Sequence, residues 1–190
     1  MTPSPAATGT DGGAMPPALS GRVAVWDPFV RLFHWSLVAL FVAAYATGDE
    51  IGWLHVRAGY ALAALVALRG VWGFVGPRNA RFASFLRSPV ETLAFLRDSL
   101  RLKAPRHLGH NPAGGAMIVA MFATLAYVSV TGVLLTADAF WGSHAMKEAH
   151  EAGVDVMIGL IFLHLAGVAL ASFEHRENLV RAMITGRKRA

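Results

Sequence analysis

The chain of 190 residues has the length of one domain, but 55% of its residues are hydrophobic, 15% are charged and its mean hydropathy is +0.47. This composition favours a membrane protein over an ordinary soluble domain. The absence of cysteine excludes disulfides, thiolate metal sites, iron–sulfur clusters and covalent haem attachment. Any metal or cofactor must therefore be held by histidine, methionine, carboxylate or other oxygen ligands.

Residues 1–21 are a polar N-terminal segment rich in Pro, Gly, Ala, Ser and Thr. The segment has no apolar run with which to form a core, and it lacks the basic start and apolar stretch of a signal peptide. We expect a disordered tail over residues 1–21 and one folded domain over residues 22–190.

Four apolar stretches follow, and each is long enough with its flanks to cross about 30 Å of hydrocarbon as a helix. They run from about Phe29 to Thr47, Trp53 to Val75, Ala113 to Thr136 and Ala145 to Phe173. The sequence therefore predicts an all-α fold, a transmembrane four-helix bundle.

The connection between the second and third stretches contains a helix start. Ser88, Pro89, Val90 and Glu91 have the form of a capping box with proline at the first helical position. A short amphipathic helix from Pro89 to about Arg101 should follow, with its apolar side towards lipid and its charged side towards water. We interpret it as an interfacial helix; a partner-docking role has no signal of its own.

Positive charge is concentrated in this second connection and in the C-terminal tail, whereas the first and third connections carry mainly acidic residues. By the positive-inside rule, both termini and the second connection, with its interfacial helix, are cytoplasmic. The net charge of +5 is thus mostly a signal of topology, which argues against nucleic-acid binding.

Four of the eight histidines, His34, His55, His150 and His164, lie within or at the ends of the predicted spans. His150 and His164 are 14 residues apart, so they share a helix face at about 21 Å separation along the axis. With the orientation above, the four histidines sort into two levels. His55 and His150 lie near the outer surface, and His34 and His164 lie on the cytoplasmic half.

Two imidazoles that face each other across a helical bundle can supply both axial ligands of a haem. The alternative for any single histidine in a membrane helix is a hydrogen-bonding group between helices or part of a proton relay. Independently placed histidines would not usually share both depth and face. The pairing at two levels therefore favours two haem sites.

Two arginines share the second stretch with His55. Arg69 stands 14 residues beyond His55, on the same face and at the cytoplasmic level, and Arg57 lies just after His55. An arginine at membrane depth needs an anion, and haem propionates are available. We predict that Arg69 neutralises a propionate of the inner haem and Arg57 one of the outer haem; snorkelling to the interface is the alternative for Arg69. Asp155 is a proton-handling group or a partner for Arg57.

Four segments carry a family likeness: VWDPFVRLFHWSLV (25–38), LHVRAGY (54–60), LGHNPAGGAM (108–117) and HLAGVALASFEHRENLVRAMITGRKR (164–189). They resemble the bacterial cytochrome b561 family, which is similar to the b-type cytochrome subunits of nickel hydrogenases, and the likeness covers about residues 22–189. The resemblance implies a bacterial inner-membrane protein with two b-type haems, held by His34, His55, His150 and His164, that exchanges electrons with the quinone pool. It also implies a redox partner of the cytochrome c, dehydrogenase or hydrogenase type.

We therefore predict an integral di-haem b-type cytochrome that transfers electrons across the membrane between a redox partner and quinone or quinol, as an electron-transfer protein or a subunit of a quinone-linked oxidoreductase. Quinol oxidation also needs a proton acceptor; the candidates are Asp155, Glu151 and His144 on the outer side and His107, His110 and His175 on the cytoplasmic side. A small histidine-lined metal-ion or proton transporter is the alternative function. A membrane anchor without haem would leave the paired histidines unexplained.

Overall fold

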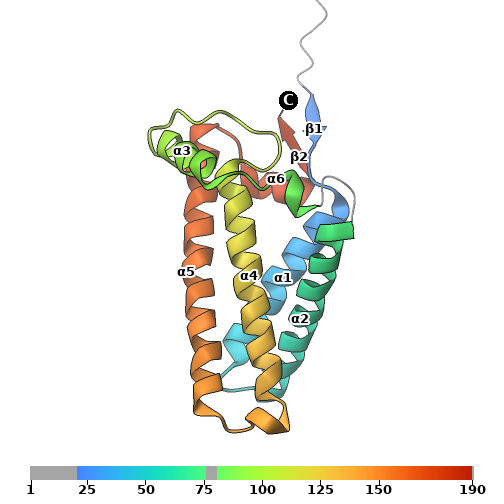
Figure 1. The fold of residues 1–190 in the computed structure, drawn as a ribbon. Helices are drawn as coiled ribbons and strands as arrows, with labels where there is room; N and C mark the ends of the chain where they lie inside the picture. The colour runs from blue at the N-terminus through green and yellow to red at the C-terminus, as the bar shows by residue number, and fades with distance from the viewer. Residues whose placement is uncertain (1–20, 76–80, 190) are drawn as a thin grey trace, which may run out of the picture.

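A computed structural model describes residues 21–75 and 81–189, so the predicted disordered tail lies outside the described residues except for Gly21. Four long helices dominate the fold (Figure 1): α1 (Pro28–Thr47), α2 (Gly52–Val75), α4 (Pro112–Leu135) and α5 (His144–Glu174). All four are long and apolar enough to cross a membrane. The predicted transmembrane bundle is confirmed, and each predicted span ends within one residue of the observed helix.

Local capping chemistry explains where these helices begin. The side chains of Asp27, Asn111 and Ser143 accept hydrogen bonds from backbone N–H groups in the first turns of α1, α4 and α5. Pro28 and Pro112 occupy first helical positions, where the N–H that proline lacks would have had no helical partner. The sequence therefore sets each of these starts within a few residues.

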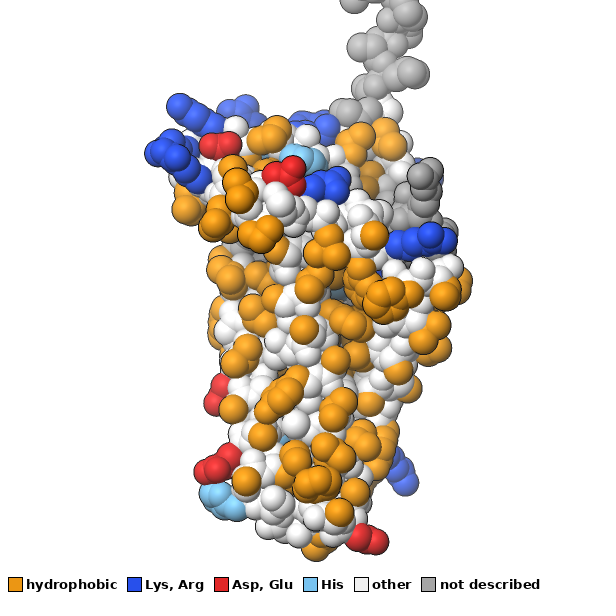
Figure 2. Space-filling view, in the orientation of Figure 1, with side chains coloured by type: hydrophobic (Ala, Val, Ile, Leu, Met, Phe, Trp, Pro, Cys, Tyr) orange, Lys and Arg blue, Asp and Glu red, His pale blue; other side chains and the backbone are white. Residues whose placement is uncertain are grey.

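The four helices form an elongated bundle in which α1 packs on α2, α2 on α4, and α4 on α5. Leu62, Val66, Leu125 and Met157 form the buried core near the middle of the bundle, and Phe41 of α1 packs against them. Many large hydrophobic side chains face outwards, and Figure 2 shows them along the whole length of the bundle. Such a surface is typical of a protein that is surrounded by lipid.

One end of the bundle carries a cap made of the 3-10 turn η2 (Phe82–Ser84), α3 (Pro89–Leu100), α6 (Leu179–Thr185) and the strands β1 (Arg22–Ala24) and β2 (Arg187–Arg189). The two strands pair antiparallel, with Val23 opposite Lys188. We call this the capped end. The opposite end carries the α1–α2 connection and the 3-10 turn η3 (Asp138–Phe140), and we call it the hairpin end. Sequence analysis did not identify α6 or the two strands, because elements this short show no hydrophobic period.

The predicted amphipathic helix is present as α3. Ser88 Oγ accepts from Glu91 N at 3.2 Å, and the Glu91 carboxylate accepts from Ser88 N at 3.0 Å, so the capping box is formed. On the side towards the bundle, Phe95 is buried and its ring centre lies 5.5 Å from that of His107. Val90 and Leu100 are each 77% exposed. The position of this apolar side against a lipid surface stays a prediction.

Candidate functional site

The structure brings His55 of α2 and His150 of α5 together at the hairpin end. Their ring centres are 6.2 Å apart and their ring planes are inclined at 81°. Both residues are half-buried between the helices. This is one of the two pairs that the sequence predicts as haem ligands.

Both rings use Nδ1 for a hydrogen bond to a backbone carbonyl. His55 Nδ1 lies 2.8 Å from the Ala44 carbonyl oxygen, and His150 Nδ1 lies 3.1 Å from that of Val128. Because a carbonyl only accepts, Nδ1 must carry the proton in each ring. A neutral imidazole protonated at Nδ1 has its lone pair on Nε2. Both histidines therefore have Nε2 available as a metal ligand.

Two imidazoles that hold one metal ion between them have a characteristic spacing. A first-row metal ion lies about 2 Å from an imidazole nitrogen, which is itself about 1 Å from its ring centre, so two axial rings have centres about 6 Å apart. The observed 6.2 Å agrees with this value. Metal-ligating histidines also usually donate their other N–H to a carbonyl or carboxylate, as both rings do here. The residues present at the hairpin end thus fit a bis-histidine haem.

The second predicted pair, His34 of α1 and His164 of α5, lies towards the capped end. Both side chains are half-buried. Nδ1 of His34 is buried and has no hydrogen-bond partner within the described residues. A buried polar atom of this kind is costly unless another group completes the site. The unpartnered Nδ1 of His34 therefore fits a site that would also contain a bound group.

Two arginines near the capped end have buried nitrogen atoms without partners. Arg69 places its guanidinium 4.9 Å from the ring centre of Phe82, and its Nη1 has no hydrogen-bond partner in the described part of the chain. The same is true of Nε of Arg31, which lies one turn before His34 on α1. Buried cationic donors require an acceptor, and the carboxylates of a haem would supply one. Sequence analysis missed Arg31, although its spacing of three residues from His34 could have indicated a shared face.

Arg57 lies elsewhere on α2. It follows His55 by two residues, which corresponds to about 200° around a helix. Its side chain is exposed, and its guanidinium lies 5.2 Å from the ring centre of Trp53. The structure therefore does not bring Arg57 to the His55 side of the helix, and its role with a propionate stays a prediction.

The proton-handling candidates at the hairpin end lie on the surface. Glu151 is 3.5 Å from Lys147, and His144 is 3.4 Å from Glu148. Asp155 is also exposed, one turn further along α5. Their side chains are thus exposed on the protein surface.

The candidates at the capped end are less accessible. The His110 ring lies between those of Trp26 and Phe85, at centre distances of 4.7 and 5.0 Å. Burial lowers the pKa of His110 to about 4, with smaller contributions from the charges of Lys188 and Arg69. His110 is therefore neutral at physiological pH.

The other two histidines of this end are held by neighbouring protein groups. His107 has Nδ1 2.9 Å from the carbonyl oxygen of Pro105, and His175 lies 3.9 Å from the carboxylate of Glu174.

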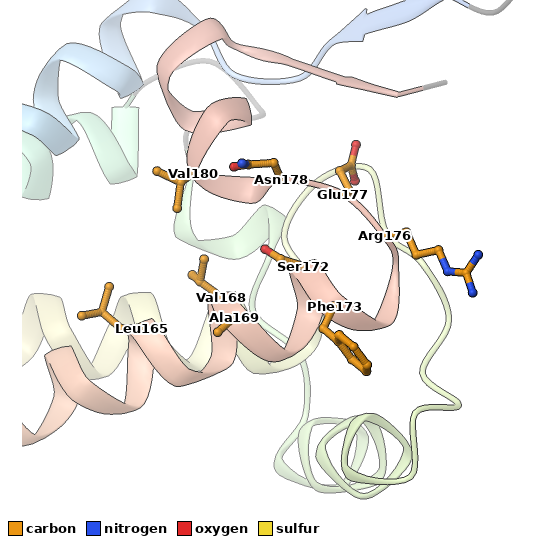
Figure 3. A pocket seen from close by; sticks show the side chains of 9 residues that line it. All are labelled: Leu165, Val168, Ala169, Ser172, Phe173, Arg176, Glu177, Asn178 and Val180. Carbon is orange, nitrogen blue, oxygen red and sulfur yellow. The ribbon is translucent and has the colours of Figure 1, made fainter.

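A surface pocket of about 550 Å³ lies between α5 and α6 (Figure 3). It begins at Leu165, next to His164, and its α5 wall is mainly apolar. Its other end is polar, with Ser172, Arg176 and Asn178. The described residues contain no group of three or more His, Asp or Glu placed to hold a metal ion.

Comparisons with known proteins identify the family of the chain. Residues 25–186 match the family model of prokaryotic cytochrome b561. The chain is also 22% identical to a probable Ni/Fe-hydrogenase B-type cytochrome subunit of Rhizobium leguminosarum bv. viciae, over 87% of this chain and 88% of the relative. No solved structure matches. The chain belongs to the prokaryotic cytochrome b561 family and is a membrane-spanning b-type cytochrome of electron transfer.

Proposed function

We propose that the protein is a di-haem cytochrome that carries electrons across the bacterial inner membrane between a redox partner and the quinone pool. His55 and His150 would hold one haem b, and His34 and His164 the other. The observation that carries the proposal is the 6.2 Å spacing of the hairpin-end rings, with both Nδ1 atoms bonded to carbonyls. A haem held by these histidines would supply one-electron transfer.

The core between the two histidine pairs supports electron transfer. On α5, Met157 is seven residues from both His150 and His164, which is nearly two helical turns, so the three residues share a face. Met157 is 1% exposed and packs with Leu62 and Leu125. Packed apolar side chains oppose the passage of hydrated ions. A histidine-lined metal or proton pathway would instead need polar groups or water at this level.

We infer that the capped end faces the cytoplasm. Figure 2 shows Lys and Arg side chains gathered at this end of the bundle. They come from the α2–α4 connection and from the segment after α5, and positive loops stay on the cytoplasmic side of a membrane. In this orientation, His34 and His164 lie on the cytoplasmic half and His55 and His150 near the outer surface.

The pocket between α5 and α6 supports a quinone site at the capped end. A quinone has a polar head and an apolar tail, and the pocket combines a polar end with an apolar wall. The lining of the pocket begins at Leu165, the residue that follows His164 on α5, so a quinone in it would lie at the same end of the bundle as the capped-end pair. The Rhizobium relative is named as a hydrogenase subunit; for this chain we propose a hydrogenase, dehydrogenase or cytochrome c as the redox partner.

A haem count and a difference spectrum of the purified protein test the central proposal. We expect two b haems per chain in the native protein and one in each of the variants His55→Ala and His164→Ala. His144→Ala is the matched control, because His144 is an exposed histidine of α5, and this variant should keep both haems. A folded, membrane-inserted native protein without haem would overturn the proposal. Reoxidation of the reduced protein by a short-chain quinone tests the acceptor, and failure to reoxidise would contradict the quinone assignment.

A further inference from the structure

Thr131 is a buried threonine of α4 whose hydroxyl contacts the His150 ring. Its exposed fraction is 6%, and its Oγ1 lies 3.1 Å from His150 Nδ1. The same hydroxyl donates to the backbone of its own helix: the carbonyl oxygen of Tyr127 lies 2.9 Å from Oγ1, and the carbonyl oxygen of Val128 lies 3.1 Å from it. A hydroxyl has a single proton to donate. Oγ1 therefore accepts from the Nδ1–H of His150.

The His150 ring thus lies against one turn of α4, from Val128 to Gly132. Its Nδ1–H is shared between the carbonyl of Val128 and the hydroxyl of Thr131. At Gly132, an added Cβ would lie 3.0 Å from Cε1 of the ring, so the missing side chain makes room for the imidazole. At His55, by contrast, Nδ1 meets one acceptor, the carbonyl of Ala44.

We propose that Thr131 is a positioning residue that orients His150 and lowers the reduction potential of the haem held by His55 and His150. Hydrogen-bond acceptors on Nδ1–H make the imidazole more basic and its Nε2 a stronger donor. A stronger donor favours the ferric over the ferrous state. The inference rests on the proposed function, since it requires a haem at this pair.

The chain offers a matched control on the same helix. Thr124 is also a threonine of α4, and its Oγ1 donates to the Ala120 carbonyl oxygen at 2.9 Å. Thr131 and Thr124 thus make the same bond within the helix, but Thr131 additionally accepts from a histidine. Replacement by valine removes the hydroxyl from each while keeping a branched side chain of similar size.

The test is a redox titration of the haem-loaded protein, followed by visible spectra, for the native chain and for Thr131→Val, Thr131→Ser and Thr124→Val. The hairpin-end haem is identified as the one lost in His55→Ala. We expect Thr131→Val to raise its potential, changing the oxidised-to-reduced ratio about threefold to tenfold, as one hydrogen bond does. Tenfold corresponds to about 59 mV for one electron. Thr131→Ser should restore the native value, and Thr124→Val should leave both haems unchanged.

An unchanged midpoint in Thr131→Val, with both haems present, would overturn the role of Thr131. So would a Thr131→Ser variant that shifts as far as the valine variant. Thr131→Ala also removes the hydroxyl and adds no bulk, so we expect it to shift the potential as Thr131→Val does. It replaces Thr131→Val in the test if the valine variant does not accumulate. Failure of the proposed function is seen separately, because it appears as a missing haem in the native protein before any titration.

Discussion

The two ends of the bundle hold their histidine pairs in different ways. At the hairpin end, the protein backbone itself satisfies both Nδ1 atoms, through the carbonyls of Ala44 and Val128. Towards the capped end, Arg31, His34 and Arg69 each have a buried nitrogen that lacks a hydrogen-bond partner in the described part of the chain. The described residues therefore satisfy both Nδ1 atoms at the hairpin end, whereas they leave buried nitrogen atoms of the capped end without partners.

This difference follows from where a membrane helix can place charge. A neutral imidazole bonded to a carbonyl is tolerated within an apolar bundle, but a guanidinium is not unless an anion lies beside it. The capped end combines Lys and Arg side chains of the cap with Arg31 and Arg69 of the bundle, so cofactor carboxylates would find cationic partners there. Substitutions at the two ends should consequently have different effects.

The largest effect is expected from filling the space beside His150. Gly132→Val would place a side chain where an added Cβ already lies 3.0 Å from the ring, so we predict that the hairpin-end haem is lost and the capped-end haem is kept. Haem content should fall from about two per chain to one, measured as the pyridine haemochrome.

Gly159→Val is the control for this variant. Gly159 lies on α5 and an added Cβ there meets no atom of the described residues within 4 Å, so this variant should keep both haems. If Gly132→Val kept two haems, the His150 ring would be able to move and still hold the hairpin-end haem.

A smaller effect is expected from removing a charge at the capped end. In Arg69→Gln, loss of a positive charge favours the ferric state, so the potential of the capped-end haem should fall. We predict a change of about tenfold in the oxidised-to-reduced ratio, similar to the effect of a neighbouring charge on a pKa. A redox titration measures it.

Arg57→Gln is the matched comparison, because Arg57 is exposed over Trp53 and should leave both potentials unchanged. A fall confined to the hairpin-end haem in this variant would instead support the propionate role predicted for Arg57 from sequence. No change in Arg69→Gln would contradict the anion partner that we assign to the capped end.

The smallest effect is expected from pH acting on the cap. The pKa of His110 falls from an ordinary 6.5 to about 4 in the folded protein, so the unfolded chain takes up a proton first as pH decreases. The contribution of His110 to the free energy of unfolding should therefore be constant above pH 6.5, decrease between pH 6.5 and about 4, and be constant again below that. Thermal unfolding at a series of pH values measures this dependence.

His110→Phe should reduce the pH dependence in this window, since phenylalanine cannot protonate between the rings of Trp26 and Phe85. His144→Gln, at an exposed histidine of the hairpin end, should keep the native dependence. Equal pH dependence in the native protein and His110→Phe would show that another group titrates.

Local sequence features determined most of the fold. Hydropathy located the four spans within one residue of α1, α2, α4 and α5, because a membrane helix must satisfy its backbone within one apolar segment. The Ser88 and Glu91 capping box likewise located α3, because all of its partners lie within one helical turn. The pairing of His55 with His150 at one depth followed from span order and helix rise.

The tertiary structure decided what depends on how each helix is rotated against its neighbours. From the sequence, Arg57 and Arg69 were both predicted to neutralise a haem propionate. In the structure, Arg57 is exposed beside Trp53, whereas Arg69 has a buried nitrogen without a partner in the described residues. The contacts of His150 with Thr131 and Gly132 join residues about 20 positions apart on different helices. Periodicity along one helix shows which residues share a face, but only the packing of helices shows what that face contacts.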